Sequence, residues 1–263
     1  MTRPAALYDW PLYYDIAFNW NPAGEVAMLD RAIADHARLP GAACRVLEPG
    51  CGTGRLLIPL ALAGYEAVGY DHSPAMIAYA RQRIADSRLA DRLRVVVADM
   101  TDAAFDPVFD AAVCPISSLS HLRDDAAIVD HFRATGRSLR VGGIYLVQLA
   151  TVWEPDLGHE PSFWTTQRDG VRVTVDWTVE ADDPDARLSH QRYTMTVDDH
   201  GERHERTETL AMRLWLDADV RRLIKASGAL ELVGAYDEAG EALPIDEPIG
   251  AGAGNAWWVC RRS

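Results

Sequence analysis

Three glycines at alternate positions, Gly50, Gly52 and Gly54, directly follow a short apolar run. Glycine lets the backbone turn tightly and approach a ligand closely, and a helix that follows such a turn presents free N–H groups to that ligand. Asp71 ends the next apolar run, where a carboxylate can accept hydrogen bonds from both hydroxyls of a ribose. These four residues predict a site for a nucleoside-like ligand.

The residue after the third glycine helps to distinguish between classes of nucleoside-like ligand. A dinucleotide-binding turn needs a small residue at position 55, where this chain has Arg55. Its long basic side chain disfavours a nicotinamide oxidoreductase. A second glycine-rich run, at residues 250–255, precedes a predicted strand instead of a helix, so we expect a loop there without a ligand-binding helix dipole.

The elements that position these residues follow from the pattern of apolar runs. Continuous apolar runs alternate with helical stretches from Ala42 to Ala150, which is typical of a parallel sheet covered by helices on both faces. The helix after the glycines is expected from about Thr53. Because Pro59 lies inside it, we also expect a kink or a late start.

After Thr151 the pattern changes to strict alternation, as in Val171 to Val179, which predicts half-exposed antiparallel strands. Further strands are expected at residues 192–197 and 207–216. Asp217 then caps a predicted helix that stops at Gly228, and two last strands follow. We therefore predict an N-terminal helical lid at 1–40, a core at 41–150 and 217–263, and an antiparallel platform at 151–216.

Composition limits the partners. The chain of 263 residues has a formal net charge of -13, which repels nucleic acid and acidic lipid alike. It shows neither a cleavable leader nor an apolar run long enough to span a bilayer, so we expect a cytoplasmic protein. No metal site and no disulfide framework are predicted, because the cysteines lack paired spacing: Cys44, Cys51, Cys114 and Cys260.

Three ordered stretches, "VLEPGCGTGR", "GYDHSPAMIAYAR" and "VVVADM", resemble the class I S-adenosylmethionine-dependent methyltransferases. The resemblance covers residues 42–150 and, more loosely, the closing strands. It implies an α/β, Rossmann-like sheet of seven mainly parallel strands whose last strand is antiparallel, with the platform inserted after the fifth strand. It also implies that S-adenosyl-L-methionine is the cofactor and lies across the carboxyl ends of the strands.

The same resemblance implies which residues contact the cofactor. Asp71 would hold the ribose, His72 and Met76 would pack on adenine, and Asp99 would accept from its exocyclic amine. Met76 and Asp99 also suit a core position and a turn, respectively. The full implied set is Tyr14, Glu48, Gly50, Gly52, Gly54, Arg55, Asp71, His72, Met76, Asp99, Met100 and Cys114.

Methyl transfer is an in-line displacement that depends mainly on positioning, with one group to remove or share a proton. His121 is the candidate, because "CPISSLSHL" leaves the carboxyl end of the fourth strand, where open parallel sheets bind ligands. This Ser-rich turn followed by His is similar to that of small-molecule N-methyltransferases of the amino-sugar or glycine type. Tyr14, in the lid, is the second candidate. Both residues also have purely structural interpretations, a helix start for His121 and helix packing for Tyr14.

We therefore predict an enzyme that transfers a methyl group to an N or O atom of a small molecule, in secondary metabolism, with His121 as base or orienting group. Two alternatives remain open. The acidic surface would attract a basic protein or peptide acceptor, and the motifs also suit an S-adenosylmethionine-binding protein with other chemistry. We expect no nucleic-acid or membrane partner, and the exposed platform edges suggest a homodimer.

Overall fold

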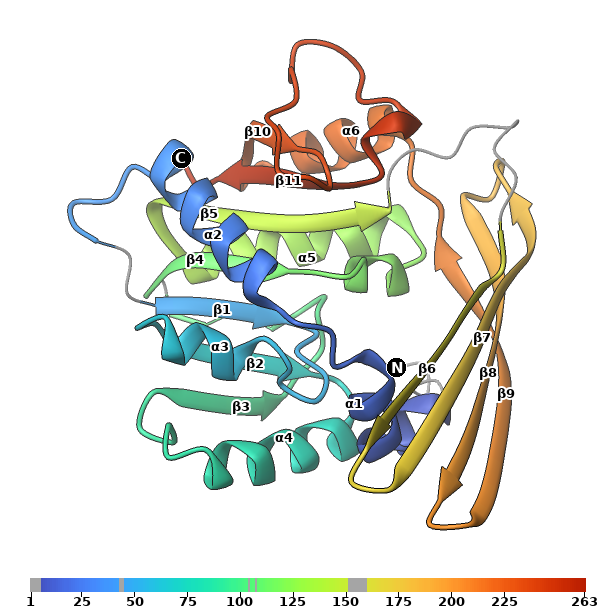
Figure 1. The fold of residues 1–263 in the computed structure, drawn as a ribbon. Helices are drawn as coiled ribbons and strands as arrows, with labels where there is room; N and C mark the ends of the chain where they lie inside the picture. Colours follow the sequence, from blue (N-terminus) through green and yellow to red (C-terminus); the bar gives the residue numbers. More distant parts are fainter. Residues whose placement is uncertain (1–5, 43–44, 104, 107, 151–159) are drawn as a thin grey trace.

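The computed structural model describes residues 6–42, 45–103, 105–106, 108–150 and 160–263. A seven-stranded sheet carries helices on both faces, and a four-stranded antiparallel sheet stands beside the carboxyl ends of its parallel strands (Figure 1). The helix α1 (Pro11–Phe18) lies between the two sheets. A small cavity beside α1 is lined by several of the predicted site residues: Tyr14, Glu48, Gly50, Gly52 and Arg55.

The seven-stranded sheet has the strand order β10-β11-β5-β4-β1-β2-β3. The strand β11 runs antiparallel to both of its neighbours, whereas β1 to β5 pair in parallel. This confirms the predicted Rossmann-like sheet with an antiparallel last strand. Its strands are β1 (Arg45–Pro49), β2 (Glu66–Asp71), β3 (Leu93–Val97), β4 (Phe109–Cys114), β5 (Leu139–Ala150), β10 (Glu231–Tyr236) and β11 (Asn255–Arg261).

Two hydrophobic layers flank this sheet. The helices are α2 (Ala23–His36), α3 (Leu57–Leu62) and α4 (Pro74–Asp86) on one face, and α5 (Asp125–Ser138) and α6 (Asp217–Ser227) on the other. Along β5, Ile144 and Leu146 belong to the layer covered by α2, α3 and α4. Tyr145 and Val147 belong to the opposite layer, which α5 and α6 cover. Side chains of a strand alternate between faces, so a continuous apolar run supplies both layers.

Two helix starts depend on local chemistry. The helix α3 begins at Leu57, later than the predicted Thr53, which places Pro59 in its first turn. A proline is tolerated there because first-turn N–H groups have no partner within the helix. The prediction that Asp217 caps α6 is wrong: Leu216 occupies the cap position, and Asp217 accepts hydrogen bonds from the Ile249 backbone and from Arg221.

Two chain turns complete the core. The helix α6 ends at Gly228, whose φ of 63° lies in the left-handed region that glycine adopts readily, as predicted. The second glycine-rich run forms the short 3₁₀ turn Ala251–Ala253 directly before β11.

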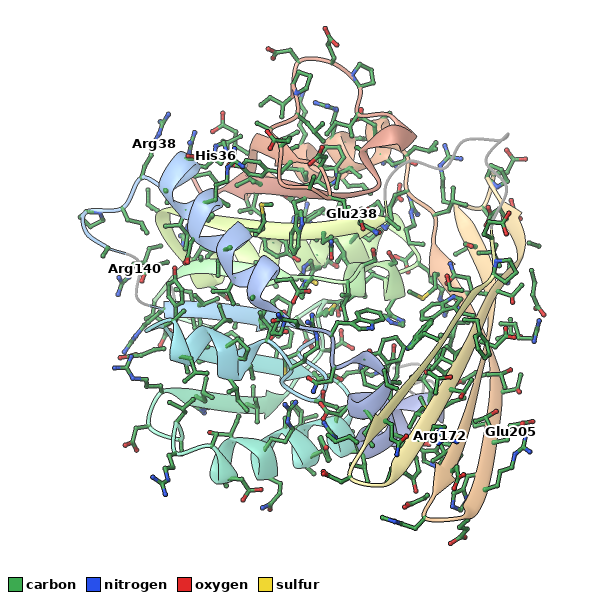
Figure 2. All side chains as sticks on the ribbon, viewed as in Figure 1. His36, Arg38, Arg140, Arg172, Glu205 and Glu238 are labelled. Carbon is green, nitrogen blue, oxygen red and sulfur yellow. The ribbon has the colours of Figure 1, made fainter. Side chains whose placement is uncertain are left out.

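The platform is a meander of four antiparallel strands. Apolar and aromatic side chains on its inner face pack against α1 and the preceding 3₁₀ turn, Ala6–Asp9. Arg172 and Glu205 are exposed on the platform (Figure 2). The sequence did not predict the first strand, and the fourth begins earlier than expected. The strands are β6 (Ser162–Arg168), β7 (Val171–Asp183), β8 (Leu188–Asp199) and β9 (Glu202–Arg213).

No helix within the described ranges combines the length and the apolar character that crossing a bilayer requires.

Candidate functional site

The glycine turn after β1 has the geometry that its composition predicts. Gly50, Gly52 and Gly54 have φ values of 66°, 52° and 74°, a region that L side chains rarely adopt. A Cβ atom at Gly50 would also overlap the Met100 side chain. Glycine at these positions lets the chain turn directly from β1 toward α3 and leaves backbone exposed to the space beside it.

Asp71, at the end of β2, lies against this turn. Its Oδ2 accepts the Gly52 N–H at 3.0 Å, and its Oδ1 accepts the Ser73 N–H at 2.8 Å. Burial raises the pKa of this carboxyl, and the two backbone donors partly offset that rise. Each carboxylate oxygen has a second lone pair, so Asp71 can still accept from the hydroxyls of a bound ligand. The structure thus brings together the residues that the sequence singled out first.

Glu48 supplies a second carboxyl beside the turn. Its side chain is buried, and among the described residues its Oε2 has no hydrogen-bond partner. Burial raises its pKa to about 8, although Arg55 nearby lowers it in part. A buried polar atom without a partner is costly, and a cationic ligand group would satisfy it. The amino group of S-adenosylmethionine is such a group, so the residues present fit this cofactor.

A small cavity of about 40 Å³ lies next to Glu48. Tyr14 and Phe18 of α1 cover it, with their rings stacked at 4.4 Å between centroids. Ligand pockets are typically about 300 Å³ or larger, so a nucleoside-sized ligand requires α1 to move outward. The cavity is lined by Tyr14, Phe18, Glu48, Gly50, Cys51, Gly52, Thr53, Arg55, Pro115, Ile116 and Ser118.

Arg55 lines the cavity but is bound to the protein itself. Its Nη2 lies 2.6 Å from Glu25 Oε1, and its Nη1 donates to the Trp20 carbonyl at 3.4 Å. The guanidinium therefore joins the glycine turn to α2. This contact gives the residue a structural role beside the predicted cofactor contact.

The residues implied for adenine are spread over three environments. His72 is exposed, with its Nδ1 3.6 Å from Asp71 Oδ1. Asp99 accepts from the backbone and the hydroxyl of Thr101; burial favours a higher pKa for its carboxyl, but these hydrogen bonds outweigh burial and the pKa is lowered. Met76 is buried in α4.

Two further residues of the implied set point into the protein. Cys114 is fully buried in β4, where it packs against the core, and burial raises the pKa of its thiol to about 12. The Met100 carbonyl is occupied by His131 Nδ1 at 3.1 Å. Cys51 and Cys260 are also buried and free of disulfides, and Cys44 lies outside the described residues.

His121 ends a short 3₁₀ turn, Ser118–His121, at the carboxyl end of β4. Ile116 and Ser117 precede it with φ values of 47° and 55°, which is strained backbone for residues other than glycine. Two hydrogen bonds hold this strained segment against β5, from the Ile116 N–H to Gln148 and from the Ala150 N–H to Ser117. The fold thus fixes the position of His121 beyond the carboxyl end of β4.

His121 has a partner that the sequence did not reveal. The hydroxyl of Tyr8, on the lid, lies 2.7 Å from His121 Nε2. Desolvation by the surrounding protein lowers the pKa of His121, so the ring is neutral at pH 7 while one side remains exposed. Nothing in the local sequence around Tyr8 distinguishes it from Tyr13, which binds Asp199 on the platform.

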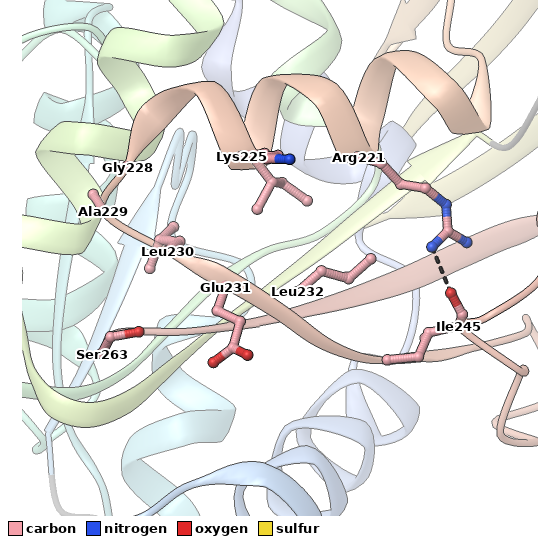
Figure 3. Close-up of a pocket in the computed structure, with 10 residues that line it drawn as sticks. Arg221, Lys225, Gly228, Ala229, Leu230, Glu231, Leu232, Ile245 and Ser263 are labelled. Carbon is pink, nitrogen blue, oxygen red and sulfur yellow. Dashed lines mark hydrogen bonds between the residues drawn. The ribbon is translucent and has the colours of Figure 1, made fainter.

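A larger hollow of about 440 Å³ lies between α6 and β10 (Figure 3). Arg221, on its rim, already donates to Asp217 and to the Ile245 carbonyl. The hollow opens at the far edge of the sheet, with β11, β5 and β4 between β10 and the strand that precedes the glycine turn. Its position at the opposite end of the strand order separates it from the site. Within the described ranges, no cluster of His, Cys, Asp and Glu could hold a metal ion.

The core of the chain is similar to known methyltransferases. Residues 46–143 match the family described as "Methyltransferase domain". The putative methyltransferase YqeM of Bacillus subtilis is 34% identical over 102 residues, which are 39% of this chain and 40% of that relative. The chain thus matches about two fifths of the length of this curated relative.

Solved structures share the complete fold. An S-adenosylmethionine-dependent methyltransferase from Clostridium acetobutylicum aligns with a TM-score of 0.76 at 15% identity, covering 98% of this chain and all of that one. The sugar N-methyltransferase KedS8 from Streptoalloteichus aligns with a TM-score of 0.73 at 22% identity, covering 96% and 92% of the two chains. Residues 46–143 therefore match a methyltransferase domain, and the whole chain shares its Rossmann-like fold with solved S-adenosylmethionine-dependent methyltransferases.

Proposed function

We propose that this protein is an S-adenosylmethionine-dependent methyltransferase that acts on a small molecule. One observation carries the proposal: Asp71 Oδ2 accepts the Gly52 N–H beside the cavity lined by Glu48, whose buried Oε2 has no hydrogen-bond partner in the described part of the chain. A ribose acceptor and an ammonium acceptor thus stand on either side of one glycine turn. That is the pair of hydrogen-bond acceptors that the two polar ends of S-adenosylmethionine require.

The residues of this chain have separate tasks in the proposed reaction. When bound, S-adenosylmethionine would supply an electrophilic methyl group on a sulfonium. Glu48 and Asp71 bind and orient the cofactor, and Tyr14 and Phe18 of α1 exclude water from it. His121 faces the acceptor as base or orienting group.

The acceptor is proposed to lie between α1 and the platform. The inner face of the platform presents aromatic side chains there, among them Trp164, Trp177 and Tyr193, which suit an organic molecule. The Tyr193 hydroxyl is buried without a hydrogen-bond partner among the described residues, so it is available to a polar group of that molecule. The fold shared with a sugar N-methyltransferase supports a small-molecule acceptor, methylated on N or O.

Calorimetric titration with S-adenosylmethionine and with its demethylated product tests the cofactor. We expect both to bind the wild-type protein, and Asp71→Asn to weaken binding at least tenfold, because charge-assisted hydrogen bonds to the ribose are lost. The control Asp130→Asn alters an exposed carboxylate of α5 that pairs with Arg133. Absence of binding at millimolar ligand, or equal affinities in all three proteins, would overturn the proposal.

Transfer itself is tested once binding is established. The protein is incubated with S-adenosylmethionine and a panel of amines and hydroxylated metabolites, and the demethylated product is measured. Product formation that depends on one class of acceptor identifies the methylated atom. If no acceptor in either class stimulates product formation although the cofactor binds, the transferase proposal fails and only cofactor binding stands.

A further inference from the structure

Tyr8 and His121 meet across the site from opposite sides. Tyr8 belongs to the 3₁₀ turn Ala6–Asp9 in the lid, and His121 belongs to the turn after β4 in the core. The Tyr8 Oη to His121 Nε2 distance is 2.7 Å, and the rings meet edge to face, with centroids 5.7 Å apart and planes at 71°. This is the geometry of a hydrogen bond between two oriented rings and not of a chance surface contact.

Contacts on both sides hold Tyr8 in this place. The backbone N–H of Leu7 donates to Glu208 Oε2 on β9 at 3.2 Å, which fastens the turn to the platform. The Tyr8 ring also lies 5.5 Å from the Tyr14 ring, which covers the cofactor cavity. Tyr8 therefore stands where the lid, the platform and the catalytic edge of the core meet.

The direction of the hydrogen bond follows from the groups available. A neutral imidazole has one N–H donor and one acceptor nitrogen, and which nitrogen holds the proton depends on the bond that the other makes. Burial raises the pKa of Tyr8, so its hydroxyl keeps its proton. That hydroxyl has no second hydrogen-bond acceptor among the described residues, and a half-buried donor left unpaired is costly. Tyr8 therefore donates to Nε2.

The proton of the His121 ring is consequently on Nδ1. This N–H has no hydrogen-bond partner in the described part of the chain, and His121 is exposed where it meets Tyr8 of the lid. The ring thus offers a donor, not a proton-accepting lone pair, to a molecule that enters that space. An oxygen of the methyl acceptor, which has two lone pairs, can receive this hydrogen bond and keep one lone pair for the methyl group; in an amine the bond must go to another polar atom, because the nitrogen has a single lone pair.

We propose that Tyr8 is a positioning residue that fixes the His121 ring as the Nδ1–H tautomer, so that His121 orients the methyl acceptor by donating a hydrogen bond. The inference rests on the proposed function for the identity of the molecule that His121 meets. It assigns His121 the orienting role and removes the role of base as long as Tyr8 occupies Nε2, so the proton that the methylated atom loses passes to solvent water.

Nitrogen NMR of the full chain labelled with ¹⁵N-histidine tests the pairing without any acceptor. At pH 7.5 we expect one His121 resonance from a protonated Nδ1 and one from an unprotonated Nε2, assigned by their loss in His121→Gln. In Tyr8→Phe the ring remains but the donor is gone, so we expect the His121 signals to shift to a mixture of both tautomers. Tyr13→Phe is the matched control, because its lost hydroxyl binds Asp199 and not His121.

Each result decides the proposal. A protonated Nε2 in the wild-type spectrum would overturn it, as would His121 signals that are identical in wild type and Tyr8→Phe. The wild-type spectrum alone fixes the direction of the hydrogen bond if the variant does not fold. Calorimetry on the same wild-type sample with S-adenosylmethionine tests the proposed function separately, since the tautomer is measured without ligand.

Discussion

Arg168 Nη1 lies 2.7 Å from Asp15 Oδ2, a contact that joins the first strand of the platform to the lid helix α1. Asp15 is 1% exposed, and its other oxygen binds Arg83 of α4 at 2.7 Å. Arg83 in turn donates to the Thr53 carbonyl in the glycine turn at 3.2 Å. One buried carboxylate therefore connects the lid, the platform and the cofactor turn.

Removing the charge of Asp15 should destabilise the folded protein. We expect Asp15→Asn to lower the free energy of unfolding by about 2 to 3 kcal/mol, because two arginines lose their charged partner. Urea denaturation measures the change. Asp86→Asn, which alters an exposed carboxylate bound to Gln82, should stay within about 0.5 kcal/mol of wild type. Equal losses in the two variants would contradict the connecting role of Asp15.

The glycine turn allows a matched pair of substitutions. Gly52→Ala faces only the cost of its positive φ, about 1 kcal/mol, because no atom lies within 4 Å of the added Cβ. Gly50→Ala has the same cost and also displaces the Met100 side chain, so its loss of stability should be larger. Thermal unfolding of both variants measures the difference. A Gly52→Ala variant at least as unstable as Gly50→Ala would argue against this packing.

Glu48 should make stability depend on pH. Its pKa rises from 4.5 to about 8 on folding because burial disfavours the charged form. Between these two pKa values the folded protein keeps a proton that the unfolded chain releases. The contribution of Glu48 to the free energy of unfolding is therefore fully present at low pH and is lost as the pH rises from 4.5 to about 8. The loss is at most about 1.4 kcal/mol per pH unit. Urea unfolding at pH 5.5 and pH 8 should show that Glu48→Gln gains stability relative to wild type at the higher pH. A constant difference between the two proteins would show that Glu48 does not titrate as described.

Cofactor binding should change the hydrogen exchange of α1, the helix that covers the cavity beside Glu48. Because Tyr14 and Phe18 nearly fill the space beside Glu48, cofactor binding requires α1 to move outward, and contacts with the bound ligand should then stabilise the helix in that position. Hydrogen exchange of a peptide covering residues 11–18 should slow in the presence of S-adenosylhomocysteine. A peptide from the β8–β9 hairpin tip, around His200, serves as the internal control and should be unaffected. Exchange that is unchanged at residues 11–18 would place the cofactor elsewhere.

Local patterns identified the core with good accuracy. Gly50, Gly52 and Gly54 require positive φ whatever surrounds them, and the run that ends at Asp71 can only be a strand buried on both faces. The prediction for Asp217 was wrong because a side chain that can cap a helix locally instead binds Ile249, a residue that the tertiary fold brings to it. The strand β6 was missed because Ser162–Arg168 is an edge strand whose residues are mostly exposed or half-exposed, so its alternation is weak.

The sequence by itself determined the parallel sheet, its glycine turn and the carboxylate at Asp71, because periodicity and backbone conformation are properties of neighbouring residues. Only the tertiary structure decided which side chains pair. Arg55 binds Glu25, Asp15 binds Arg168, and Tyr8 occupies His121 Nε2. Such pairs join residues far apart in the chain, and their distances depend on how the lid and the platform pack onto the core, which no local pattern contains.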